Sequence, residues 1–222
     1  DELKHIALSP NGKFVYTSEV NASGDSVSGF RIDPTSGDLS PVGRFVTGSF
    51  PHSVVISPNG KFAYTANYLG DSLSAFSANA DTGSLAQISA VAGGKAGAVM
   101  PLIAGSNPRI VAVHPNGIFL YVILESRDFI DSFSIDQSTG ALTQLTDDTG
   151  KALETPIGNA GMPAVGGGLM FEPSGSYLYE TNRNPTNSVS RYEVDPVTGK
   201  LKLMRIYAGG NNPVSIGFGP NR

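Results

Sequence analysis

Short apolar segments alternate with polar turns along the whole chain. Segments such as 53–56 and 110–113 are apolar at nearly every position, which predicts strands buried on both faces. Segments such as 26–30 and 72–76 alternate between polar and apolar residues, which predicts strands with one buried face. No segment of useful length combines helical apolar periodicity with capping residues. The pattern therefore predicts an all-β protein.

Two turn sequences recur along the chain. The first is Ser-Pro-Asn-Gly or a close variant, which begins at residues 9, 57, 114 and 172, with the start of a fifth copy at 219. Each complete copy is followed by two aromatic residues two positions apart, which places both rings on one face of a strand. These pairs are Phe14 and Tyr16, Phe62 and Tyr64, Phe119 and Tyr121, and Tyr177 and Tyr179. The second turn runs from an aspartate to a glycine, at 33–37, 81–83, 136–140 and 195–199. Aspartate accepts backbone N–H bonds in such a turn, and glycine supplies its positive φ.

Each repeat thus predicts four short antiparallel strands, which is the make-up of a β-propeller blade with its first strand innermost. A β-sandwich is the alternative fold, but it does not require the same two turns at the same offsets four times. The sequence predicts one propeller domain with blades at about 1–48, 49–105, 106–165 and 166–210, and the first strand of a fifth blade in 211–222. The longer connections at 90–107 and 147–168 are either functional loops over one end of the propeller or plain linkers.

The composition of the chain excludes several kinds of site and partner. The chain has 222 residues, a net charge of −4 and no cysteine, which excludes disulfides, thiolate metal sites and a cysteine nucleophile. There is no basic excess to neutralise phosphates and no run of 18 apolar residues, so neither a nucleic-acid partner nor a membrane span is expected. No metal-binding, phosphate-loop or nucleophile-elbow motif is present, and no metal or cofactor is expected. The glycosylation sequon at 21–23 is compatible with a secreted protein, and the composition equally with a cytoplasmic one.

The repeat unit, with its Pro-Asn-Gly-Lys-Phe-x-Tyr and Asp-x-x-Thr-Gly-x-Leu segments, resembles that of the lactonase β-propellers. This family is similar to bacterial 6-phosphogluconolactonase and to the fungal carboxymuconate-lactonising enzyme. The resemblance covers essentially the whole chain. It implies a fold of seven blades, of which this chain encodes little more than four, and a lactone site at the mouth of the central channel.

The resemblance also implies the residues of that site. Segments 66–70 and 181–183 resemble the Asn-Tyr and Asn-Arg blades of the family, and segments 50–53 and 107–109 resemble its Pro-His and Pro-Arg blade entries. Glu125 falls where family enzymes carry an acid, although a second gap-free alignment makes Asp128 the matching acid. The predicted catalytic residues are Glu125 and His52, and the predicted substrate-binding residues are Arg109, Arg183 and Tyr68.

Lactone hydrolysis requires a base that activates water, donors that stabilise the oxyanion, and a cation that holds any carboxylate or phosphate of the substrate. Glu125 or His52 is the candidate base, and Arg109 and Arg183 are candidates for binding an anionic substrate. Each residue also has a structural interpretation. Arg109 could form a salt bridge between blades, and Arg183 could pair with Glu180 or another surface acid. Glu125 could be a solvated loop acid beside Arg127, and His52 could form a backbone hydrogen bond. His114 and His5 are expected to have purely structural roles.

Three hypotheses follow. The leading one is a lactonase-like propeller that hydrolyses or forms a sugar or carboxylated lactone, with a small-molecule lactone or anionic sugar as its ligand. The second is a non-enzymatic propeller that serves as a binding or scaffold module. The third concerns assembly: four blades and one strand leave two sheet edges open, which predicts either a fragment of a larger propeller or a second chain that completes the ring.

Overall fold

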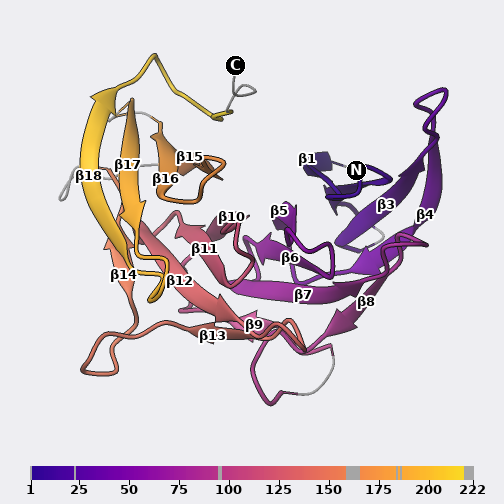
Figure 1. Ribbon diagram of the computed structural model, residues 1–222, viewed down its shortest axis with the longest axis horizontal. Helices are drawn as coiled ribbons and strands as arrows, with labels where there is room; N and C mark the ends of the chain where they lie inside the picture. Colours follow the sequence, from indigo (N-terminus) through magenta and orange to yellow (C-terminus); the bar gives the residue numbers. More distant parts are fainter. Residues whose placement is uncertain are drawn as a thin grey trace.

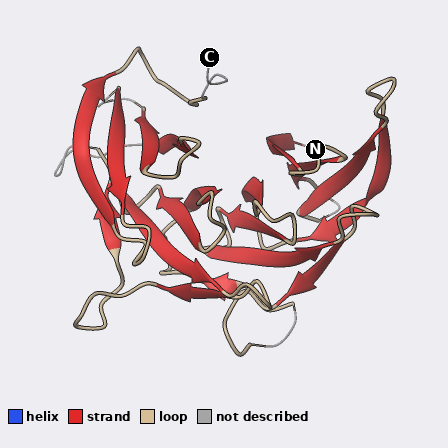
Figure 2. Cartoon of the chain, in the orientation of Figure 1, coloured by secondary structure: helices blue, strands red, loops and turns tan. Residues whose placement is uncertain are grey.

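The computed structural model describes residues 2–22, 24–94, 97–158, 166–183, 185 and 187–217. Within these ranges the chain forms strands and turns and no helix, so no helix is long and apolar enough to cross a membrane. The strands form four antiparallel sheets, in each of which consecutive strands lie side by side. The prediction of an all-β protein built from four-stranded units is confirmed (Figure 2).

We number the sheets blades 1 to 4 in chain order. Blade 1 consists of β1 (Glu2–Leu8), β2 (Phe14–Val20), β3 (Ser26–Ile32) and β4 (Leu39–Val46). Blade 2 consists of β5 (Pro51–Ile56), β6 (Phe62–Asn67), β7 (Ser72–Ala78) and β8 (Leu85–Ile88). Blade 3 consists of β10 (Pro108–Val113), β11 (Phe119–Leu124), β12 (Phe129–Ile135) and β13 (Leu142–Gln144). Blade 4 consists of β15 (Gly166–Phe171), β16 (Tyr177–Asn182), β17 (Ser188–Val194) and β18 (Leu201–Ala208).

The four blades lie in an open arc (Figure 1). The first strand of each blade faces the centre of the arc and the fourth lies at its rim, and blades 1 and 4 lie on either side of the opening. The long connections each add a short strand to a blade: β9 (Met100–Pro101) pairs with β7, and β14 (Glu154–Pro156) pairs with β12. The expected first strand of a fifth blade is not formed in 211–217, and 218–222 lie outside the described residues.

Each pair of consecutive blades encloses its own hydrophobic cluster. The aromatic pair of one blade faces the aspartate–glycine turn of the next. The hydroxyl of Tyr64 donates to the carbonyl oxygen of Gly140 at 2.9 Å, and Tyr16 and Tyr121 make the same bond, also at 2.9 Å, to Gly83 and Gly199. The repeated aromatic pair therefore forms the contact between blades.

Burial differs between the middle and the ends of the arc. Every residue of β6 and β11 is buried, because blades 2 and 3 have a neighbour on both faces. In blade 1, by contrast, Leu3 and Ile6 on β1 are 67% and 64% exposed. Their partners on β2 are Glu19 and Thr17, so this apolar surface is the face of blade 1 that points away from blade 2.

The aspartate–glycine turns form as expected in three blades. In blade 3, for example, Asp136 accepts the backbone N–H groups of Ser138 and Thr139. In blade 2 the prediction that the turn begins at Asp81 is wrong. Asn79 is the residue that accepts the two N–H groups, from Asp81 and Thr82, because an asparagine side-chain oxygen caps this turn as an aspartate does.

Candidate active site at the channel mouth

A β-bulge occurs at the start of the innermost strand in every blade. The pairing register shifts at Lys4 in blade 1, at His52 in blade 2, at Arg109 in blade 3 and at Gly167 in blade 4. A bulge leaves one extra residue on the bent strand and redirects its side chain. The same position of each blade is therefore occupied by Lys4, His52, Arg109 and Gly167 in turn.

A second set of residues lies opposite these bulges. Tyr68, Glu125 and Arg183 each follow directly after the second strand of their blade. The antiparallel register pairs the last residue of that strand with the first residue of the innermost strand, as in Pro51 with Asn67. Each blade thus contributes two neighbouring positions to one end of the central channel, and we call this end the mouth.

Arg109 and Glu125 form an ion pair at the mouth. The Arg109 Nη1 atom lies 2.6 Å from Glu125 Oε2, and both side chains are about 15% exposed. The Arg183 Nη2 atom from blade 4 lies 3.9 Å from the other oxygen, Glu125 Oε1. Glu125 is therefore placed between two guanidinium groups from different blades, and the salt bridge predicted for Arg109 lies within blade 3 rather than between blades.

His52 and Tyr68 lie beside this cluster. Their ring centroids are 5.9 Å apart. Burial, followed by the positive charge of Arg109, lowers the pKa of His52 to about 4, so that the imidazole is neutral at pH 7. Burial and the nearby Glu125 carboxylate raise the pKa of the Tyr68 phenol. The Nδ1 atom of His52 is buried without a hydrogen-bond partner among the described residues.

Blade 1 adds a charged pair that the sequence analysis missed. The Lys4 Nζ atom lies 2.5 Å from Glu2 Oε1 and 4.6 Å from the centroid of the Phe50 ring. The Phe50 ring in turn lies 5.8 Å from that of Tyr68, so Lys4 belongs to the same end of the channel as His52 and Tyr68. A sequence signal was available, since Lys4, His52 and Arg109 all stand six residues before the proline of the following turn. The proline that precedes His52 and Arg109 is replaced by Leu3 in blade 1.

The alternative partners considered for Glu125 and Arg183 form contacts with other residues. Arg127 pairs with Glu154 and not with Glu125. Glu180 is fully buried and accepts a hydrogen bond from the Tyr192 hydroxyl at 2.8 Å, so it is not the surface partner proposed for Arg183. Asp128 has a φ of 58° in the turn between β11 and β12, the place that Asp71 takes in blade 2 and Asn187 in blade 4.

Two histidines lie outside the cluster of charges. The Nε2 atom of His114 is 2.9 Å from the carbonyl oxygen of Gly175, and its Nδ1 atom accepts the N–H of Asn116, in keeping with the structural role expected for it. His5 lines an open channel of about 560 Å³ below the mouth, whose walls are otherwise apolar. Among the described residues, no group of three or more histidine, aspartate or glutamate side chains is placed to hold a metal ion.

Comparison with known proteins identifies the class. The family described as "Lactonase, 7-bladed beta-propeller" matches residues 2–101 and 95–221, so the chain belongs to this family. A probable 6-phosphogluconolactonase of Arthroderma benhamiae is 33% identical over 117 residues, which are 48% of this chain and 28% of that protein. The solved structure of the periplasmic gluconolactonase of Pseudomonas aeruginosa superposes with a TM-score of 0.78 and 22% identity, over 99% of this chain and 61% of that one. The chain thus spans less than two thirds of the length of either protein.

Proposed function

We propose that the mouth is a lactone-hydrolysing site for a small anionic lactone of the sugar type. The observation that carries the proposal is the convergence of side chains from different repeats, with Glu125 placed between Arg109 and Arg183. Membership of the lactonase family and the similarity to a probable 6-phosphogluconolactonase support the same class of substrate.

The roles follow from the charges. Glu125, the only carboxylate placed between the two guanidinium groups in the part of the chain that is described, takes a proton from the attacking water. The Arg109 and Arg183 guanidinium groups stabilise the oxyanion that forms on the carbonyl oxygen and bind the anionic substituent. When the ring C–O bond breaks, the leaving oxygen receives the proton from Glu125, and the product is the open hydroxy acid.

His52 is the second polar group for the substrate. With a pKa of about 4 its imidazole stays neutral at pH 7, so it accepts or donates a hydrogen bond without adding charge. A pKa this low makes His52 a weak base at neutral pH, and Glu125 is therefore the base in this proposal.

A turnover assay with a matched control tests this assignment. Glu125→Gln keeps the size of the side chain and removes the base, and we expect it to lower kcat for 6-phosphoglucono-1,5-lactone by about 10²-fold or more. The control is Glu154→Gln, because Glu154 is also paired with an arginine of blade 3 but lies away from the mouth. Unchanged turnover in both Glu125→Gln and Arg183→Ala would overturn the site assignment.

The competing hypothesis is a propeller that binds its ligand without converting it. An intact wild-type chain that opens none of a plain, a phosphorylated and a carboxylated lactone would favour this hypothesis. Binding of the corresponding open acid would then define the mouth as a recognition site.

A further inference from the structure

Phe50 adopts a backbone conformation that is unfavourable for its residue type. Its φ is 59°, in the left-handed region that bulky L-residues rarely occupy, and it precedes a proline, which restricts its backbone further. Two later repeats carry an asparagine at the equivalent entry, Asn107 and Asn212, with φ values of 48° and 54°. Asparagine tolerates this region and phenylalanine does not.

The repeat itself imposes this conformation. At each entry, a side chain from the preceding blade accepts the backbone N–H of the left-handed residue. Asp25 binds the Phe50 N–H at 2.6 Å and Asp71 binds that of Asn107 at 2.9 Å. Asn187 binds that of Asn212 at 2.7 Å. The backbone conformation is therefore common to these entries, and only the choice of phenylalanine at position 50 requires a separate explanation.

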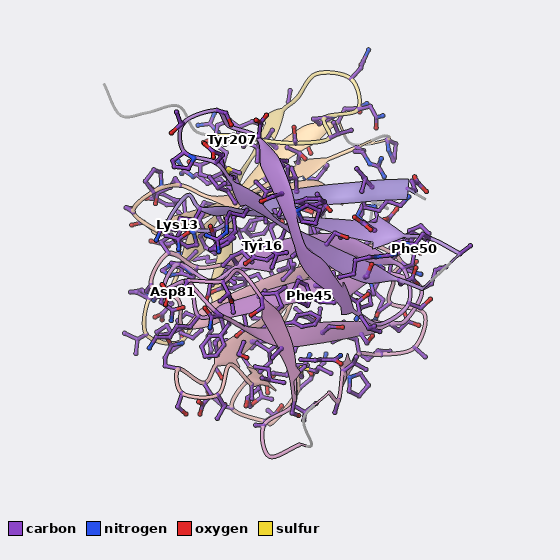
Figure 3. All side chains as sticks on the ribbon, turned by 90° about the vertical axis from the view of Figure 1, so that its right-hand side faces the viewer. Lys13, Tyr16, Phe45, Phe50, Asp81 and Tyr207 are labelled. Carbon is purple, nitrogen blue, oxygen red and sulfur yellow. The ribbon has the colours of Figure 1, made fainter. Side chains whose placement is uncertain are left out.

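Local structure does not explain the phenylalanine. The Asn107 side chain stabilises its surroundings, since its Nδ2 donates to the carbonyl oxygen of Tyr68 and its Oδ1 accepts from the Ser126 hydroxyl. A phenyl ring makes neither bond. The Phe50 ring instead lies 5.8 Å from the Tyr68 ring and beneath the Lys4 ammonium group. Figure 3 places Phe50 at the end of the molecule opposite to Lys13 and Asp81.

We propose that Phe50 is a specificity-determining residue of the mouth, and that with Tyr68 it forms an aromatic wall for the C–H face of a saturated lactone ring. This inference rests on the proposed function. The two rings are both half-buried and tilted by 50° to each other, and they stand between Lys4 and His52. Aromatic faces pack against C–H groups, while the neighbouring cations bind an anionic or hydroxylated substituent of the same ligand.

The experiment compares Phe50→Asn with the wild-type chain. Asparagine is the residue that two other repeats carry at this φ, as Asn107 and Asn212, so the variant relieves strain and we expect its melting temperature to stay the same or rise. With glucono-1,5-lactone as substrate, we expect KM to rise about tenfold, the size of a lost aromatic contact, with kcat within about twofold. Phe50→Leu retains apolar volume without a ring, and the same rise in KM is expected.

The control is Tyr207→Asn, because Tyr207 also carries a cation on its ring, that of Arg205, and lies far from Phe50 in Figure 3. This variant should keep the wild-type KM. A folded Phe50→Asn chain with unchanged KM overturns the inference while the proposed function stands, and wild-type affinity in Phe50→Leu overturns the requirement for a ring.

Calorimetric binding of D-gluconate separates the inference from catalysis. A wild-type chain without turnover that binds gluconate, with binding weakened about tenfold in Phe50→Asn, supports the aromatic wall and overturns only the hydrolysis. A wild-type chain that neither converts the lactone nor binds the acid overturns both proposals.

Discussion

Replacing Gly140 and Gly37 by alanine in turn distinguishes two contributions to stability, the packing between blades and the backbone strain of the turn. Gly140 ends the aspartate–glycine turn of blade 3 with a φ of 75°, and the Phe62 ring of blade 2 faces it. A Cβ atom added here would lie well inside van der Waals contact with that ring. Gly37 ends the same turn in blade 1 with a φ of 77°, and a Cβ atom there would have no neighbour within 4 Å.

Both substitutions introduce backbone strain, but only Gly140→Ala also overpacks the interface between blades. An alanine in the left-handed region costs roughly 1–2 kcal/mol, which we expect for both Gly37→Ala and Gly140→Ala. Overpacking a filled interface costs roughly a further 1–3 kcal/mol, which applies to Gly140→Ala alone. We therefore expect a loss of roughly 1–2 kcal/mol at Gly37 and of roughly 2–5 kcal/mol at Gly140.

Urea unfolding of the two variants measures the difference. The midpoint concentration should fall in both, with the m-value unchanged, because the same surface is exposed on unfolding. In thermal unfolding, 1 kcal/mol corresponds to about 2–4 °C for a chain of this size. Equal losses in the two variants would refute the assignment of the Phe62–Gly140 contact as an energetic contact between blades.

Two further predictions concern pH and assembly. Burial raises the pKa of Glu180 to about 8, above the value near 4.5 that it has in the unfolded chain. Between these two pH values the folded state keeps a proton on Glu180 that the unfolded state has released. The free energy of unfolding should therefore fall as the pH rises from about 4.5 to 8. Glu180→Gln should flatten this part of the stability curve, and parallel curves for wild type and variant would contradict the assignment. The exposed apolar face of blade 1, which includes Leu3 and Ile6, should make the chain associate in solution. Sedimentation velocity over a series of chain concentrations tests this, and a chain that stays monomeric throughout the series would contradict the expectation.

The fold could be predicted because the contacts between blades recur in the sequence. Tyr64 and Gly140 are 76 residues apart, yet each belongs to a motif that is found in every repeat. The turn at Asn79 was misplaced because asparagine and aspartate have the same capping geometry, which the sequence pattern alone does not resolve.

The site could be predicted only in part. The resemblance to the lactonase propellers points to His52, Arg109 and Glu125, because their segments match the blade entries and strand ends of that family. That Glu125 pairs with Arg109 and not with Arg127 depends on side-chain directions set by the bulge, which the sequence does not specify. The conflict between Phe50 and its backbone depends on a φ angle and becomes evident only in three dimensions.

The residues that pack the blades together and the residues that line the mouth occupy different positions of the same repeat. The Tyr–Gly bonds between blades involve similar residues at each described interface, because each must fill the same space. At the mouth, the bulge directs the side chain whatever its identity, and the residue changes from Lys4 to His52 to Arg109 along the arc. A substitution at the mouth should therefore alter ligand binding at small cost in stability, whereas one at the Tyr–Gly contact should do the reverse. Phe50 has features of both groups, because its backbone conformation is the one that the repeat imposes while its ring lies among the residues of the mouth.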